Sequence, residues 1–219
     1  MVADLYFEAG DYPTGFAYLD EQMAAREAAG QPIPEAWVKH AFVTAYNNDL
    51  PEQARDYSLR YVEAYPNKTT WGDAIAVALN GTRYEYPEIL DILRLSRRTD
   101  TFRDGSMYTE YIEAADPRKF PGEVLAVIDE GYASGMLDRS DPYVTESRAE
   151  AERRIQADKN DLPALLADAR AANANLVTVM AAGDTFLSYD RAAEAEEFYT
   201  KALAMPGVNT PLVLTRLGI

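Results

Sequence analysis

The side chains that most often carry out catalysis or bind metals are scarce in this chain. It contains one histidine, His40, and no cysteine. The lack of cysteine excludes disulfides, thiolate nucleophiles and cysteine-ligated metal centres. His40 lies one helical turn after Trp37, so we interpret it as a half-buried structural imidazole rather than a general base or a metal ligand. We expect neither a cofactor nor a metal.

Carboxylates, in contrast, are abundant, with 36 Asp and Glu residues. Acid–base catalysis needs two carboxylates in a dry cleft with their pKa values pushed apart, and a chain this acidic contains neighbouring pairs by chance. We interpret these pairs as solvated helix faces and expect no enzyme activity. The pairs are Asp129 with Glu130, Glu150 with Glu152, and the group Glu194, Glu196 and Glu197.

The charge balance limits the possible partners. The formal net charge is −15, whereas nucleic acids and anionic membranes need clustered Lys and Arg. No apolar run approaches the roughly 18–20 residues of a membrane span. We therefore expect a neutral to basic protein or peptide partner, no nucleic acid and no membrane span.

Two further groups of side chains are candidates for binding. Tyr57, Tyr61 and Tyr65 recur every four residues and form one stripe of a predicted helix, which we interpret as packing between helices rather than ligand stacking. One basic cluster could dock an acidic element of another subunit, although a solvated helix end is our first interpretation. It consists of Arg94, Arg97, Arg98 and Arg103.

The sequence pattern indicates that a repeated helical unit positions these side chains. Trp37 and Trp71 lie 34 residues apart, and each opens a similar pattern, EAWVKHAFVTAY and TTWGDAIAVALN. A further copy is visible in VTVMAAGDTFLSYDRAAEAEEFYTKALAMPG. There, Gly183 and Phe186 are the small and aromatic residues of the first helix, and Ala195, Tyr199 and Ala202 are those of the second. Two antiparallel helices can approach closely where a small residue faces an aromatic ring of the neighbouring helix.

The chain resembles the tetratricopeptide repeat family in this spacing and in these small, aromatic and closing proline positions. The resemblance covers residues 2–66, 69–80 and 176–207, and the middle of the chain departs from the pattern. More loosely, the Ala-rich helices resemble exported repeat proteins of proteobacteria, which favours a bacterial periplasmic location over a cytoplasmic one. The resemblance implies an all-α fold, an α-α superhelix or right-handed solenoid of antiparallel helix hairpins.

We expect one helical-repeat domain over residues 1–219, with every proline in a loop or at a helix start. Both ends lack a polar capping face, so we expect a piece of a longer array, or self-association through these ends. The predicted helices are 2–9, 14–29, 35–47, 52–65, 70–79, 87–98, 105–115, 121–134, 142–157, 162–173, 175–187, 190–204 and 211–219. The predicted pairs are 2–29, 35–65, 70–98, 105–134, 142–173 and 175–204, with a half repeat at 211–219.

In the family that this chain resembles, the first helix of each repeat lines an inner groove. The resemblance therefore implies a partner-binding groove, which could clasp an extended peptide. The predicted function is a non-catalytic scaffold for protein–protein interaction; the alternative is a periplasmic carbohydrate-binding or polysaccharide-export module. The implied groove residues are Lys39, Phe42, Tyr46, Asp73, Ala76, Asn80, Glu110, Glu113, Met180 and Asp184.

Overall fold

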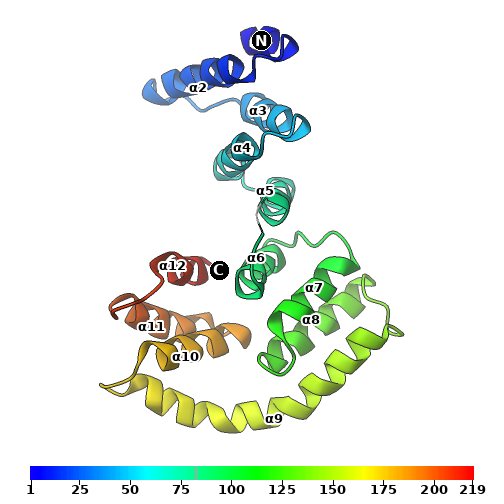
Figure 1. Ribbon diagram of the computed structural model, residues 1–219, viewed down its shortest axis with the longest axis vertical. Helices are drawn as coiled ribbons and strands as arrows, with labels where there is room; N and C mark the ends of the chain where they lie inside the picture. The colour runs from blue at the N-terminus through cyan, green and yellow to red at the C-terminus, as the bar shows by residue number, and fades with distance from the viewer. Residues whose placement is uncertain (82) are drawn as a thin grey trace. The chain divides into compact units, whose positions relative to one another are not determined.

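All regular structure in the described part of the chain is α-helical. The computed structural model describes residues 1–81 and 83–219, which form twelve α-helices and no strand (Figure 1). Successive helices within each half of the chain pack against one another. The predicted all-α fold of sequentially packed helices is therefore confirmed.

The helices divide between two compact units, whereas the sequence analysis treats residues 1–219 as one array. Unit 1 comprises Met1–Tyr84 and Thr99–Thr101, and unit 2 comprises Glu85–Arg98 and Phe102–Ile219. Unit 1 contains α1 (Val2–Glu8), α2 (Tyr12–Ala28), α3 (Glu35–Asn47), α4 (Pro51–Ala64) and α5 (Lys68–Gly81). Unit 2 contains α6 (Tyr86–Arg98), α7 (Gly105–Ala115), α8 (Pro121–Ser134), α9 (Pro142–Arg170), α10 (Leu176–Ser188), α11 (Ala192–Leu203) and α12 (Thr210–Gly218). The expected pair 70–98 is thus shared between the units.

A residue with a positive φ angle follows the first helix of four hairpins. Asp49 after α3, Asp116 after α7 and Asp190 after α10 have positive φ angles of 54°, 54° and 58°, and Gly10 after α1 has a φ angle of 75°. Asp tolerates this left-handed region better than most residues, because its short side chain can hydrogen-bond locally. Residues with positive φ also follow α2, α6 and α8, so this conformation ends helices in many parts of the described chain.

Close approach of paired helices depends on small residues that face aromatic rings. A Cβ atom on Gly183 of α10 would lie 2.7 Å from Cε1 of Tyr199 on α11. In α2, a Cβ atom on Gly15 would collide with the ring of Phe7 at the end of α1. Only glycine leaves room for these rings, so both contacts follow the general rule that a small residue lets an aromatic ring of the neighbouring helix approach.

The core of unit 1 is apolar and contains the tyrosine stripe of α4. Tyr57 and Tyr61 are 4% and 5% exposed. The Tyr57 hydroxyl donates to Asp20 at 3.0 Å, and the Tyr61 hydroxyl donates to Glu35 at 2.7 Å. Both rings therefore serve packing between helices, as interpreted from the sequence.

The helices of unit 2 follow an arc in which the long helix α9 links α8 to α10, and α6 lies at the open side of the arc, between the α7–α8 hairpin and α12 (Figure 1). Arg216 of α12 contacts Asp91 of α6, 125 residues earlier in the chain. This contact joins the last helix of the unit to the first. It goes beyond the nearest-neighbour packing of a simple repeat array.

One predicted helix boundary is wrong. The sequence suggests two helices, 142–157 and 162–173, with Pro163 opening the second; the structure has a single helix, α9, with Pro163 in its interior. Proline lacks an N–H and its ring crowds the preceding turn, so an interior proline weakens a helix without always ending it. α9 is curved rather than straight (Figure 1). None of the described helices is both long enough and apolar enough to cross a membrane.

Replacing Pro163 with alanine should stabilise the protein. The exposed Pro163 side chain lies inside α9, and alanine is favoured over proline in a helix interior by up to about 3 kcal/mol. We expect Pro163→Ala to raise the free energy of unfolding in urea by roughly 1–3 kcal/mol. The matched control is Pro142→Ala at the first turn of the same helix, where proline is well tolerated. A gain from Pro142→Ala equal to that from Pro163→Ala would contradict this explanation.

Candidate functional site

The predicted groove residues fall in both units. Two of them meet at a cavity of about 690 Å³ in unit 1, which we call the hairpin cavity. It lies among α3, α4 and α5, and its lining includes Tyr46, Asp49, Glu52 and Asn80. The Tyr46 side chain is 52% exposed. The structure therefore brings an aromatic ring and an amide from two predicted first helices to one concave surface.

The other predicted groove residues of unit 1 lie outside the described lining of this cavity. Phe42 is 6% exposed and belongs to the apolar core. It follows the buried Val38 by about one helical turn, so its ring lies on the buried face of α3. Lys39 is exposed, and Asp73 and Ala76 are half-buried.

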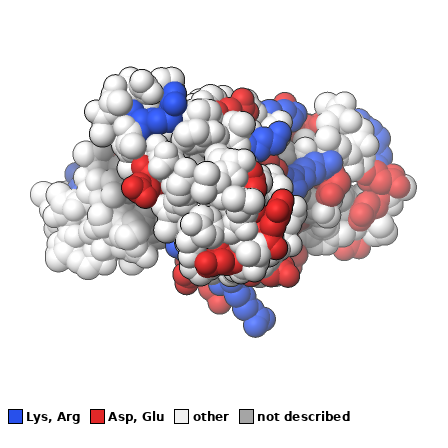
Figure 2. Space-filling model, turned by 90° about the horizontal axis from the view of Figure 1, so that it is seen from above, with Lys and Arg blue, Asp and Glu red and all other residues white. Residues whose placement is uncertain are grey.

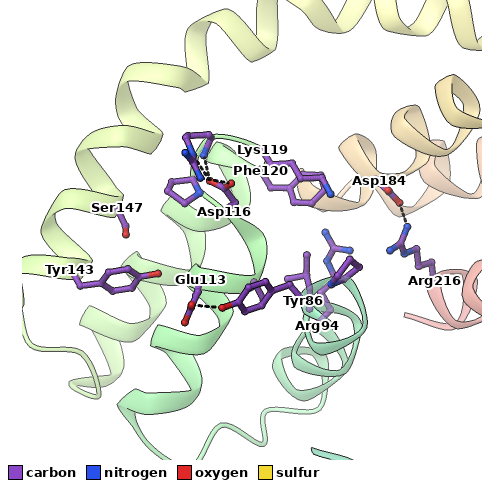
Figure 3. Close-up of a pocket in the computed structure, with 15 residues that line it drawn as sticks. Tyr86, Arg94, Glu113, Asp116, Lys119, Phe120, Tyr143, Ser147, Asp184 and Arg216 are labelled. Carbon is purple, nitrogen blue, oxygen red and sulfur yellow. Dashed lines mark hydrogen bonds and ion pairs between the residues drawn. The ribbon is translucent and has the colours of Figure 1, made fainter. Parts of the chain in front are cut away.

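A second cavity, of about 540 Å³, lies in unit 2 and is called here the tyrosine cavity (Figure 3). Predicted groove residues Glu113 and Asp184 both line it. An adjoining cavity, also of about 540 Å³, contains Asp184 and Met180. Glu110 is half-buried and lies outside both described linings. The tyrosine cavity is lined by Tyr86, Pro87, Leu90, Arg94, Glu113, Ala114, Asp116, Pro117, Arg118, Lys119, Phe120, Tyr143, Ser147, Asp184 and Arg216.

A buried network of charges adjoins the tyrosine cavity. Arg94 of α6 donates to both carboxylate oxygens of Glu123 on α8, at 2.8 and 2.7 Å. It also donates to Asp91 at 3.2 Å. The Tyr111 hydroxyl of α7 completes this part by donating to Glu123 at 2.6 Å. Arg94, Asp91 and Glu123 are only 4%, 3% and 2% exposed.

Arg216 extends the network to the last helices of the unit. Its Nε lies 3.0 Å from Oδ2 of Asp91, and its Nη1 lies 2.6 Å from Oδ1 of Asp184. The Tyr199 hydroxyl of α11 donates to the same Asp184 oxygen at 2.8 Å. Each buried charge thus faces an opposite charge, which is the condition for burying ions at tolerable cost.

The network changes the acidity of its members. Burial alone would lower the pKa of Arg94, but the hydrogen bonds and charge of Glu123 outweigh it and raise the pKa. Burial, followed by the charge of Glu123, raises the pKa of Tyr111 well above its ordinary value. Burial, followed by the charge of Asp184, does the same for Tyr199. Arg94 therefore stays cationic and both tyrosines stay neutral.

The predicted basic cluster is only partly buried: Arg94 is buried, Arg97 is half-buried, and Arg98 and Arg103 are exposed. Besides Arg94, Arg97 binds Glu130 at 2.6 Å and Arg98 binds Asp190 at 2.5 Å. Among the described residues on the face in Figure 2, Lys and Arg side chains are scattered rather than joined in one continuous patch. The arginines of α6 therefore contribute ion pairs within unit 2.

The single histidine, His40, lies in unit 1, between a carboxylate and an aromatic ring. His40 Nε2 lies 2.8 Å from Oδ1 of Asp4, without the alignment of a hydrogen bond. Its ring packs 5.7 Å from that of Phe7. In the described part of the chain, no group of three or more His, Cys, Asp or Glu side chains could hold a metal ion. This placement agrees with a structural imidazole.

The sequence analysis missed Tyr86, Tyr143 and Arg216. A signal was present for Arg216, because it follows Val213 by three residues and so lies on the apolar face of α12. Tyr86 and Tyr143 each begin or nearly begin a helix beside a proline. No pattern in the sequence shows that these two helix starts face the same cavity.

No model of a known protein family matches this chain, and no curated protein matches it significantly. The tetratricopeptide resemblance therefore remains a prediction. The site must be interpreted from its own geometry.

Removing the buried ion pair between Arg94 and Glu123 should lower the free energy of unfolding far more than removing an exposed ion pair of the same geometry. Removing one partner of a buried ion pair leaves an uncompensated charge and costs roughly 3–5 kcal/mol. We expect Arg94→Ala to lower the free energy of unfolding of unit 2 by that amount in urea. The matched control is Arg170→Ala, since Arg170 binds Glu197 at 2.9 and 2.8 Å on the exposed surface. Equal losses from both variants would refute a special role for the network.

Stability should fall in alkali as buried tyrosines ionise. Tyr111 and Tyr199 have pKa values above the ordinary 10.0, and burial, followed by Glu35, raises the pKa of Tyr61 to about 12. The pKa values of these tyrosines are higher in the folded state than in the unfolded state. Their contribution to the free energy of unfolding is therefore complete below about pH 10 and is lost as the pH rises toward the folded-state pKa values. Urea unfolding at about pH 9 and about pH 11 should show the fall. A free energy of unfolding that stays level or rises across this window would contradict it.

Proposed function

We propose that this protein is a non-catalytic helical scaffold that binds a neutral or basic peptide, or the corresponding segment of a partner protein. The observation that carries the proposal is the meeting of Tyr46 and Asn80 at the hairpin cavity. Both were selected from the sequence as groove residues, and they come from different helices of unit 1. The resemblance to peptide-binding helical repeats supports the same assignment.

The side chains at this cavity suit an extended peptide. The ring of Tyr46 is exposed and provides an apolar contact with a polar tip. The Asn80 amide donates one N–H to the carbonyl of Ala76 at 2.9 Å. Because a primary amide has two N–H donors and an acceptor oxygen, Asn80 retains groups for a peptide backbone.

The charges around the cavity favour a neutral or basic ligand. Asp49 and Glu52 are both exposed at its edge. The one arginine in its described lining, Arg55, lies 3.5 Å from Asp56. Cationic side chains of a peptide would therefore approach an acidic rim, which increases association rates at low ionic strength.

The test is to select peptides from a random displayed library on the purified chain and to measure their affinities. We expect the selected peptides to be neutral or basic, and Tyr46→Ala and Asn80→Ala each to weaken binding by roughly tenfold, as for residues at the centre of an interface. Basic peptides should also bind more weakly in high salt.

The matched control is Leu59→Ala. Leu59 is 53% exposed on α4 and lies outside the described lining of the hairpin cavity. It should leave peptide affinity unchanged. Failure to select any peptide, or selection of peptides that bind the Tyr46 and Asn80 variants normally, would reject the proposal.

A further inference from the structure

Two exposed tyrosines flank a carboxylate at one end of the tyrosine cavity. Tyr86 at the start of α6 is 51% exposed, and Tyr143 at the start of α9 is 39% exposed. Figure 3 shows their hydroxyl ends pointing toward each other, with Glu113 of α7 between them. The consecutive helices α6 and α7 and the later helix α9 therefore contribute to one small aromatic and acidic surface.

Glu113 differs from the other carboxylates that line this cavity. Asp116 is bound by Arg118 at 3.0 Å, and Asp184 is bound by Arg216 at 2.6 Å. In contrast, no Lys or Arg of the described residues forms an ion pair with Glu113, which accepts a hydrogen bond from the neutral Tyr86 hydroxyl. Among the described residues, therefore, no cation is paired with the negative charge of Glu113.

The surroundings agree with a negative local potential. The hydrogen bond to Glu113, followed by its charge, raises the pKa of Tyr86. Burial raises the pKa of Tyr143, and the charges of Glu113 and Asp116 add to this effect. Both phenols therefore stay neutral beside the Glu113 carboxylate.

The cations of the cavity lie elsewhere and are held. Arg94 and Arg216 are bound within the buried network, and Arg118 is bound to Asp116. Lys119 lies 4.8 Å from the centre of the Phe120 ring, in a separate part of the cavity from the two tyrosines (Figure 3). None of them fills the space beside Glu113.

We propose that Tyr86, Glu113 and Tyr143 form a binding site for an organic cation, specifically an alkylammonium group. Glu113 would balance its charge, and the two phenols, whose hydroxyl ends point toward Glu113, would border its N-methyl or N-methylene groups (Figure 3). A small metal ion fits less well, because the site offers one carboxylate and two neutral phenols rather than several oxygen ligands. An anionic ligand would meet the unbalanced charge of Glu113. The site lies in unit 2, so it does not depend on the peptide-binding proposal for unit 1.

The ammonium group could belong to a free amine or to a lysine side chain. The probes are choline, N-acetyl-lysine methylamide and its trimethylated form, with maltopentaose as a neutral polyhydroxyl probe. Calorimetric titration of the full chain gives their affinities. Tighter binding of choline would identify a free quaternary amine as the ligand, and tighter binding of either lysine derivative would identify a protein side chain. Both results support the ammonium site.

Variants assign the binding to the proposed residues. Tyr86→Ala, Tyr143→Ala and Glu113→Gln should each weaken the best probe by roughly three- to thirtyfold, the range expected for a cation–aromatic or charge contact. Tyr86→Phe should keep most of the affinity, because it keeps the ring. Lys119→Ala should leave the affinity equal or higher, because it removes a positive charge from the cavity.

The matched control is Tyr132→Ala, which removes a ring from α8 outside the described lining of the cavity. It should bind the probes as the unchanged chain does, and all variants should keep the same helicity by circular dichroism. Absence of binding by every ammonium probe would overturn the proposal. So would binding of maltopentaose at equal affinity, or an unchanged affinity in Glu113→Gln.

Discussion

The burial of charge along α6 is the constraint on which unit 2 depends. Arg94, Asp91 and Glu123 are almost inaccessible to solvent, and an ion in such a place is tolerated only when opposite charges and hydrogen bonds surround it. Those partners come from α7, α8 and α12, and Asp184 of α10 and Tyr199 of α11 complete the network around Arg216. The charges of α6 therefore reach a favourable state only when helices from both ends of the unit are in place.

Different interactions therefore stabilise the interior of each unit. In unit 1, apolar and aromatic side chains pack mainly between neighbouring helices, and the buried tyrosines direct their hydroxyls to nearby carboxylates. Such packing resembles a nearest-neighbour array, in which stability accumulates hairpin by hairpin. In unit 2, the contact between Arg216 and Asp91 spans 125 residues, so this network forms only after a long loop has closed.

Local features of the fold could be read from the sequence, and distant pairings could not. Helix positions and close contacts such as Gly183 with Tyr199 follow from periodicity and from side-chain size over a few tens of residues. The continuity of α9 was missed because a proline inside a helix has the same local signature as one at its start. Tyr46 and Asn80 do meet at a cavity, whereas Phe42 is buried. Helical spacing predicts which face of a helix a residue lies on only to within about one position. For Phe42, that uncertainty decided whether the side chain lies at the groove or in the core.

The same network explains why an unbalanced carboxylate at the tyrosine cavity is physically reasonable. A buried Glu without a partner would be strongly unfavourable, and the structure pairs Glu123 and Asp91 with arginines accordingly. Glu113 is exposed, so water stabilises its charge at little cost to folding. Glu113 and Tyr86, however, lie on α7 and α6, two helices that the buried network joins through Tyr111, Glu123 and Arg94, so their backbone positions are largely set before any ligand arrives. A site that is preorganised in this way loses less entropy on binding, and displacing water from Glu113 requires a ligand that supplies the missing positive charge.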